Sequence, residues 1–316
     1  MKPEEFGRLS RRAVTLGLGA GVIAGLSGPA FAQAGRSLIE RRESQYNTIY
    51  VARQGPNITM LFSVNTAIFS ESSYNPSDPG SLVFAYTQYM MAALAYPPQP
   101  RQILEIGLGG GRMATYIHGH MSDANITCVE LDPVVIEMAR RHFAFREDSR
   151  LRAVQGDGRI FLDRSRDQYD IIKLDAYRGT FVPFHLTTQE FYQLCRRRLR
   201  PGGCVAQNIA PDTLLYDACI ATMRSVFANV DEYFTGTGLN DSSVIAIAYD
   251  GLRKTPQQLA QAAQAMQRRY RFRHPLPDLV ARRREVPTRL TARPLTDDFA
   301  PVESLRSIER YNARRQ

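Results

Sequence analysis

The sequence predicts an α/β fold, in which a doubly wound sheet carries helices on both faces and follows a small N-terminal antiparallel β-sheet. Between residues 101 and 250, short apolar runs alternate with segments of helical pattern, which is typical of a parallel sheet covered by helices. Residues 45–71 instead hold short β-prone runs, and a polar turn at residues 55–57 separates the first two. This second pattern is typical of antiparallel strands.

The composition narrows the class of protein. The chain has 316 residues, of which 44% are hydrophobic and 22% charged, and this argues against wholesale disorder. Four cysteines are too few for a disulfide scaffold, and we expect buried free thiols. Five histidines without a Cys/His cluster predict no metal. The net charge is +9, but the arginine clusters lack the interleaved aromatic residues of a single-strand binder, so no nucleic-acid partner is expected.

Residues 1–32 have the layout of an export signal. The pair Arg11–Arg12 precedes an apolar run over residues 13–26, and residues 29–32 place small side chains where a signal peptidase reads them. The apolar run is shorter than the roughly 20 residues of a membrane span. We expect a twin-arginine signal and an exported, periplasmic protein that meets the membrane only through this signal. An uncleaved anchor or a fortuitous N-terminal helix is the alternative.

After the signal, three regions are expected. Residues 33–97 form the N-terminal β-sheet region and a helix, residues 98–252 the α/β domain, and residues 253–316 a C-terminal helix and tail. Prolines at 97, 98 and 100 end the first helix and mark the boundary. Apolar runs predict strands at 46–52, 59–64, 66–70, 103–106, 126–130, 151–154, 171–174, 204–209, 230–234 and 244–248.

Helices are expected between these strands and after them. Pro133 stands at the first turn of one helix, where proline is favoured, and Thr188 is a suitable N-cap for another. The helical segments are 82–96, 112–118, 133–142, 188–199, 212–227 and 255–270.

Three strand ends carry the pattern of an adenosine site. A glycine turn at residues 107–111 follows the strand 103–106, and glycine lets the backbone approach a ligand closely. Glu130 ends the next strand, where a carboxylate can accept from both ribose hydroxyls. Asp157 ends the third strand and could accept from an adenine amino group. The residues predicted to bind this ligand are Gly107, Gly109, Gly110, Glu130, Asp157 and Gly158.

The fourth strand of the α/β domain ends at Asp175. Open parallel sheets bind their ligands beyond the carboxyl ends of the strands, so Asp175 is expected to face the same pocket. A helix-capping or turn-capping role is the alternative reading of this residue.

Several segments resemble the spermidine synthase (polyamine aminopropyltransferase) family over roughly residues 43–250. They are residues 44–49, 84–88, 188–192 and 199–203, beside the strand ends above. Residues 182–188 and 295–303 resemble the divergent spermidine synthase-like branch. The resemblance implies a methyltransferase-like Rossmann fold. It also implies decarboxylated S-adenosylmethionine, or S-adenosylmethionine, as co-substrate, a small-molecule amine or other acceptor, and a possible homodimer.

The resemblance also assigns roles to single residues. It implies that Asp175 deprotonates the attacking amine, and we expect Tyr86 or Tyr177 to orient the nucleophile. Asn47 stands where the family has a glutamine in its opening strand and is expected at the cofactor. On the acceptor side we expect the three residues Gln88, Arg178 and His185.

Three carboxylates of the family pattern are absent, since the chain has Gln88, Gly110 and Arg178 in their places. Arg178 or Arg112 could accept the carboxylate of S-adenosylmethionine, so transfer of a methyl group, or of some other group from the sulfonium, stays open beside aminopropyl transfer. A non-catalytic nucleoside-binding or polyamine-binding protein is the third hypothesis. The acidic residues that could return a negative charge to the pocket are Asp297, Asp298 and Glu303.

Overall fold

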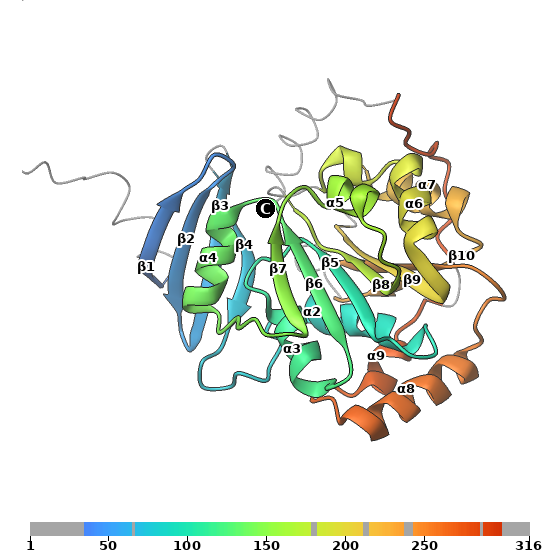
Figure 1. Cartoon of the computed structure of the whole chain (residues 1–316), viewed down its shortest axis with the longest axis horizontal. Coiled ribbons are helices and arrows are strands. Elements are labelled where there is room, and N and C mark those ends of the chain that lie inside the picture. The colour runs from blue at the N-terminus through green and yellow to red at the C-terminus, as the bar shows by residue number, and fades with distance from the viewer. Residues whose placement is uncertain are drawn as a thin grey trace, which may run out of the picture.

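The structure, a computed structural model, describes residues 35–64, 67–177, 182–210, 215–236, 243–284 and 287–298. The expected export signal at 1–32, Arg178 and Glu303 lie outside these residues. Within them the chain forms a four-stranded sheet beside a seven-stranded sheet that carries helices (Figure 1).

The N-terminal sheet is antiparallel, with the strand order β1-β2-β3-β4. Its strands are β1 (Arg36–Glu43), β2 (Thr48–Gln54), β3 (Asn57–Val64) and β4 (Ala67–Tyr74). A tight turn at Gly55 and Pro56 joins β2 to β3, and Gly55 has a φ of +57° there. Strand β1 was not predicted, because its eight residues hold five charged side chains and little apolar alternation.

The large sheet has the order β10-β11-β9-β8-β5-β6-β7. Its strands are β5 (Gln102–Ile106), β6 (Asn125–Glu130), β7 (Leu151–Gln155), β8 (Tyr169–Leu174), β9 (Leu199–Ile209), β10 (Asn229–Phe234) and β11 (Val244–Tyr249). Strands β5 to β9 are parallel, as expected, but β11 is antiparallel to both of its neighbours. The expectation of a wholly parallel sheet was wrong at β11, since the short connection from β10 favours a hairpin over a crossover.

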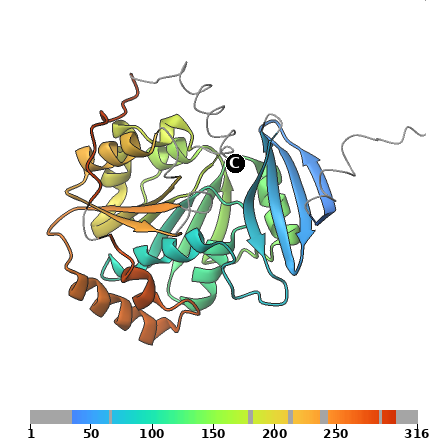
Figure 2. The ribbon, with the colours of Figure 1, turned by 180° about the vertical axis from the view of Figure 1, so that it is seen from behind.

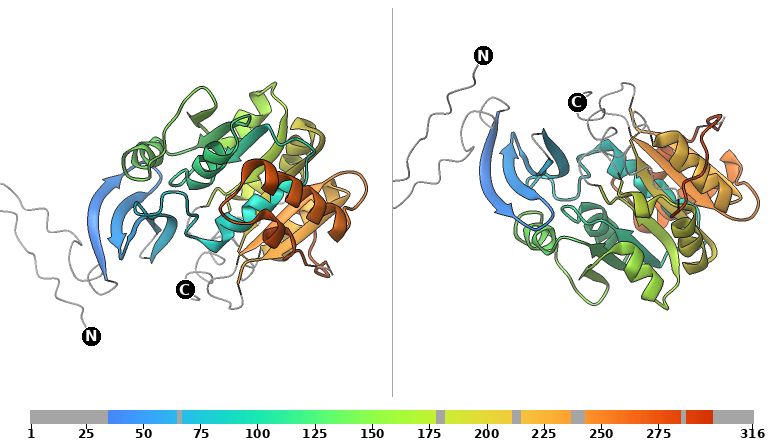
Figure 3. Two further views of the ribbon diagram at one scale, coloured as in Figure 1. Left: turned by 90° about the horizontal axis from the view of Figure 1, so that it is seen from below. Right: turned by 90° about the horizontal axis from the view of Figure 1, so that it is seen from above.

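Two sets of helices cover the two faces of this sheet (Figures 2 and 3). One face carries α2 (Ala85–Tyr89), the 3₁₀ helix η1 (Met90–Ala95), α3 (Arg112–His120), α8 (Pro256–Tyr270) and α9 (Leu276–Val280). The other carries α5 (Gly158–Arg164), α6 (Gln189–Arg198) and α7 (Tyr216–Val226). The predicted doubly wound, methyltransferase-like architecture is confirmed. The single helix expected at 82–96 is instead α2 followed by η1, and the short α5 and α9 were not predicted.

Helix α4 (Pro133–His142) connects the two parts of the molecule. Val135 and Met138 of α4 pack with Phe143 against Ile49 and Met60 of the N-terminal sheet. This apolar contact holds the small sheet over the carboxyl ends of the strands in the large sheet (Figure 1). Burial of such side chains contributes about 1.5–3 kcal/mol each.

The structure confirms two further expectations from the sequence, the N-cap of α6 and the state of the cysteines. Thr188 caps α6 through a hydrogen bond from the backbone of Phe191, as predicted. The four cysteines are buried and free, which also agrees. Across the described ranges, no helix is both long and apolar enough to span a membrane.

A buried ion pair lies between neighbouring strands of the large sheet. Lys173 on β8 and Glu105 on β5 are directly paired in the parallel register, and Nζ lies 3.0 Å from Oε2. Both side chains are almost completely buried. Removal of one partner would leave an uncompensated charge in the interior.

We expect Lys173→Met to lower the free energy of unfolding by about 3–5 kcal/mol, because the Glu105 carboxylate loses its cation. The double variant Lys173→Met/Glu105→Leu is expected to recover most of this loss, since no buried charge remains. Urea unfolding of the wild type and both variants measures the difference. Equal stability of the single variant and the wild type would contradict the expectation.

Candidate active site

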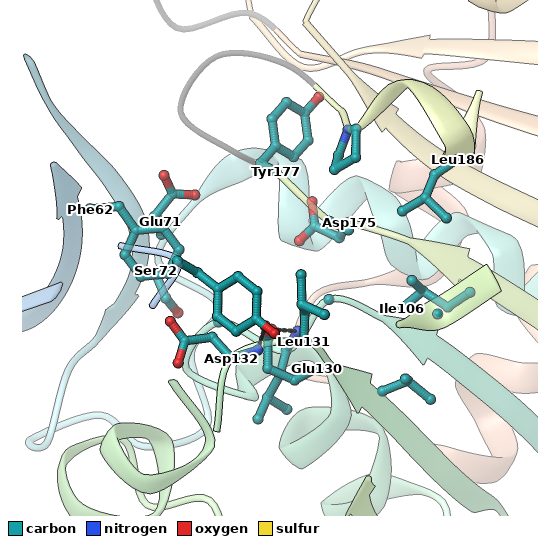
Figure 4. A pocket seen from close by; sticks show the side chains of 18 of the residues that line it. Phe62, Glu71, Ser72, Ile106, Glu130, Leu131, Asp132, Asp175, Tyr177 and Leu186 are labelled. Atoms are coloured by element: carbon teal, nitrogen blue, oxygen red, sulfur yellow. Dashed lines mark hydrogen bonds between the residues drawn. The ribbon is translucent and has the colours of Figure 1, made fainter. Parts of the chain in front are cut away.

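A cavity of about 470 Å³ lies where the N-terminal sheet meets the carboxyl ends of β5, β6, β7 and β8 (Figure 4). Ten of the site residues predicted from the sequence line it, and they come from seven separate segments of the chain. They are Asn47, Tyr86, Gly107, Gly109, Glu130, Asp157, Gly158, Asp175, Tyr177 and His185. Gly110 and Gln88 do not line it, and Arg178 lies outside the described residues.

The glycine turn packs directly against the end of β8. Gly107 has a φ of +90°, and a Cβ atom there would lie 2.4 Å from the carbonyl oxygen of Asp175. The backbone NH of Asp175 also donates to the carbonyl of Ile106 at 2.9 Å. A side chain at position 107 would therefore push the Asp175 backbone away from the turn.

Glu130 connects the turn to the end of β6. Its Oε2 accepts from the backbone NH of Leu108 at 2.9 Å, and its Oε1 accepts from that of Asp132 at 3.0 Å. Burial raises the pKa of Glu130, while these backbone hydrogen bonds favour the charged form. Each carboxylate oxygen still has acceptor capacity. Glu130 can therefore serve ribose hydroxyls from a rigid position.

Asp157 combines a structural contact with a place in the cavity. Its Oδ1 accepts from the backbone NH of Ile160 as the N-cap of α5, and its Oδ2 lies 2.8 Å from Nε2 of His185. The structure thus brings His185 to the adenine side predicted from Asp157 and not to Asp175. His185 belongs to the short 3₁₀ helix η2 (Phe184–Leu186) at the border of the cavity.

Asp175 is held from two sides. Its Oδ2 accepts from the hydroxyl of Tyr86 at 3.2 Å, and its Oδ1 accepts from the amide of Asn208 at 3.0 Å. Burial raises the pKa of Asp175 to about 7, although the two hydrogen bonds favour the charged form. Tyr177 acts indirectly, because its hydroxyl donates to the backbone carbonyl of Asn208. A buried carboxylate with such a pKa can exchange a proton near neutral pH.

Two residues at this site were missed by the sequence reasoning, Asn208 and Glu71. Asn208 interrupts an apolar run near the carboxyl end of β9, next to β8, and this polar interruption is the signal that could have found it. Glu71 belongs to β4 and lines the cavity from the side of the N-terminal sheet. Burial and the charges of Asp175 and Glu130 raise the pKa of Glu71 well above its usual range. No local pattern distinguished this glutamate from an exposed one.

Two residues that were expected to contact a ligand, Gln88 and Gly110, instead contact other parts of the protein. The side-chain amide of Gln88 donates to the backbone carbonyl of Leu82 at 2.7 Å, so it holds the start of α2. A Cβ on Gly110 would lie 2.6 Å from both Ser72 Oγ and Phe143 Cδ1. Gly110 is thus a packing position under β4, and its contact with a ligand is not supported by this geometry.

The charged residues that the sequence offered as further ligand contacts already make contacts within the protein. The guanidinium of Arg112 donates to the backbone carbonyls of Phe143 and Pro79 and lies 4.4 Å from the centre of the Tyr74 ring. Its two terminal nitrogens are therefore engaged by backbone carbonyls, while its Nε has no hydrogen-bond partner in the described part of the chain. Asp297 forms an ion pair with Arg159, and neither Asp297 nor Asp298 lines the cavity.

The described lining of the cavity is acidic. Its carboxylates are Glu71, Glu130, Asp132, Asp157 and Asp175, and its basic side chains are Arg112 and His185. In the described ranges, no cluster of three or more His, Cys, Asp or Glu is arranged to hold a metal ion. This excess of carboxylates favours a ligand that carries positive charge.

A doubly wound sheet with a glycine turn and acidic strand ends places a ligand site beyond the carboxyl ends of its parallel strands. Residues 83–245, which are 163 of the 316 residues, match the spermine/spermidine synthase domain. The chain therefore belongs to the spermine/spermidine synthase family.

Comparison with individual proteins agrees with this assignment. The chain is 31% identical over 195 residues to the polyamine aminopropyltransferase of Vibrio vulnificus, a match that covers 60% of this chain and 65% of that protein. The chain spans less than two thirds of the length of the first curated relatives that it matches.

Two solved structures share the fold. A probable spermidine synthase from Corynebacterium glutamicum superposes with a TM-score of 0.64 at 19% identity, over 83% of this chain and 97% of that one. Human methyltransferase-like protein 13, solved in complex with SAH, gives a TM-score of 0.54 at 24% identity, over 59% and 92%.

The raised pKa of Asp175 predicts a pH-dependent stability. Between an unfolded pKa of about 4 and the folded pKa of about 7, the folded state binds more protons, so this residue makes the fold less stable as the pH rises. We expect Asp175→Asn to stabilise the protein more at pH 8 than at pH 5. Urea unfolding at both pH values measures the two gains. An equal gain at both would contradict the raised pKa.

Proposed function

We propose that the protein transfers an aminopropyl group from decarboxylated S-adenosylmethionine to an amine acceptor, with Asp175 as the general base. The observation that carries this proposal is the Asp175 carboxylate, which faces the cavity between two hydrogen-bond donors and has a pKa of about 7. Membership of the spermine/spermidine synthase family supports it.

The reaction needs positioning and one proton acceptor. The amine nitrogen attacks the carbon next to the sulfonium, a C–N bond forms, the C–S bond breaks, and neutral methylthioadenosine leaves. The proton lost by the attacking nitrogen passes to Asp175, whose pKa suits proton transfer near neutral pH. Tyr86 and Asn208 hold the carboxylate in place, and orientation of the two reactants supplies further acceleration.

The nucleoside end is assigned to the strand ends of β6 and β7. Glu130 would accept from the ribose hydroxyls and Asp157 from the adenine amino group, while the glycine turn lets the backbone approach the ligand. Support comes from their joint position along the cavity and from the backbone hydrogen bonds that orient Glu130.

Methyl transfer is less well supported. S-adenosylmethionine carries a carboxylate, which the five acidic side chains of the lining would repel. Arg112, which was expected to offset this repulsion, already donates to two backbone carbonyls. A homodimer and the identity of the amine stay predictions from the family resemblance.

The choice between the two reactions is tested by binding of their nucleoside products. We expect calorimetric titration of the full chain to show tighter binding of methylthioadenosine than of S-adenosylhomocysteine, because only the second ligand carries a carboxylate. Tighter binding of S-adenosylhomocysteine would overturn the proposal in favour of methyl transfer.

We expect Asp175→Asn to lower the rate of aminopropyl transfer by about 10²- to 10⁴-fold. The affinity for methylthioadenosine should stay close to that of the wild type, because this ligand needs no base. The exposed Asp167 offers a matched control, and Asp167→Asn should leave both values unchanged. Undiminished turnover by Asp175→Asn, measured as methylthioadenosine release, would place the base elsewhere.

We further propose that residues 1–32 direct the chain to the periplasm by the twin-arginine route, on the evidence of the Arg11–Arg12 pair and the apolar run after it. Cell fractionation after expression of the full chain is expected to find the protein in the periplasm. The variant Arg11→Lys/Arg12→Lys should remain in the cytoplasm. Export of that variant at the wild-type level would exclude the twin-arginine route.

A further inference from the structure

Strand β4 lies directly on the glycine turn. A Cβ on Gly109 would lie 3.8 Å from the carbonyl oxygen of Glu71, and one on Gly110 would lie 2.6 Å from Ser72 Oγ. The N-terminal sheet therefore places residues 71 and 72 on the turn that is assigned to the nucleoside. Figure 4 shows Glu71 and Ser72 on the side of this sheet and Asp175 on the side of β8.

Glu71 has an unsatisfied carboxylate. Its Oε1 is buried and accepts no hydrogen bond, and no cation pairs with it in the described part of the chain. The negative charges of Asp175 and Glu130 act on it across the cavity and, with burial, raise its pKa. A buried carboxylate oxygen without a partner is costly, and a bound cation removes this cost.

The other carboxylates of the lining already have protein partners. Glu130 accepts from the backbone of Leu108 and Asp132, Asp132 from Val134 and Ser44, Asp157 from Ile160 and His185, and Asp175 from Tyr86 and Asn208. Among these lining carboxylates, Glu71 is thus the one with a buried oxygen that has no hydrogen-bond partner in the described part of the chain. Gly110, where the family resemblance implies an aspartate, cannot take its place, because Ser72 and Phe143 fill the space of its Cβ.

We propose that Glu71 binds the primary ammonium of the aminopropyl group and thereby selects the decarboxylated nucleoside over S-adenosylmethionine. The inference rests on the proposed function, because it assigns one end of the same co-substrate. A carboxylate and an ammonium form a charge-assisted hydrogen bond that a neutral nucleoside cannot make. The α-carboxylate of S-adenosylmethionine would instead be repelled by Glu71 and Asp175.

The test compares two ligands that differ in the aminopropyl group. Calorimetric titration of the full chain with decarboxylated S-adenosylmethionine and with methylthioadenosine gives the ratio of their affinities. We expect Glu71→Gln to weaken binding of decarboxylated S-adenosylmethionine by about 10- to 100-fold. Binding of methylthioadenosine should change by less than about threefold, because this ligand lacks the ammonium.

Two further variants serve as controls. Glu43→Gln changes an exposed glutamate of the same sheet and should leave the affinity ratio unchanged. Glu71→Asp keeps the charge on a shorter side chain and should give a ratio between those of the wild type and Glu71→Gln. If Glu71→Gln does not fold, as judged by circular dichroism, a reduced ratio in Glu71→Asp is the expected result and an unchanged ratio overturns the inference.

The outcomes separate this inference from the proposed function. An unchanged ratio in folded Glu71→Gln, with wild-type preference for decarboxylated S-adenosylmethionine, would overturn the role of Glu71 and leave aminopropyl transfer standing. Wild-type preference for S-adenosylhomocysteine over methylthioadenosine would overturn the proposed function and this inference together.

Discussion

The close contact between the glycine turn and the end of β8 is the constraint on which the site depends. Position 107 has no room for a Cβ, because the Asp175 carbonyl oxygen occupies that space. This contact brings the predicted nucleoside turn and the Asp175 carboxylate to one edge of the sheet. Strand β4 then covers the same turn through Ser72. The cavity is therefore enclosed between two separate sheets.

Closure of the cavity determines its electrostatics. Burial raises the pKa of Asp175, Glu130 and Glu71 together, because a carboxylate loses hydration and lies near other negative charges. For Asp175 this produces a base suited to neutral pH. For Glu71 the same burial leaves a group that a cationic ligand would stabilise. A sulfonium nucleoside with an ammonium end has the charge that such a cavity favours.

The chain departs from the family pattern at three acidic positions. The resemblance implies carboxylates at positions 88, 110 and 178, where this sequence has glutamine, glycine and arginine. In the structure Gln88 holds the start of α2 and Gly110 supports β4, so both positions serve packing. Glu71 places a carboxylate on the opposite wall, from the N-terminal sheet. The proposed chemistry is thereby reconciled with the departures from the family pattern.

The positions of three cavity carboxylates could be predicted from local sequence. Glu130 is the last residue of β6, and Asp157 and Asp175 follow closely after β7 and β8, whose carboxyl ends meet at one edge of the sheet. Periodicity and capping residues such as Thr188 likewise located most helices and strands, because these signals act within a few residues. The bounds of α4 agree with the expected 133–142 for the same reason.

The sequence by itself determined the α/β class, the glycine turn and the acidic strand ends, since each depends on residues close together in the chain. Only the tertiary structure decided the reversal of β11, the contact of Asn208 with Asp175 and the place of Glu71 in the cavity. It also decided that Arg112 is held by Phe143 and Pro79. These features depend on how distant segments pack, and no local spacing encodes which polar groups that packing brings together.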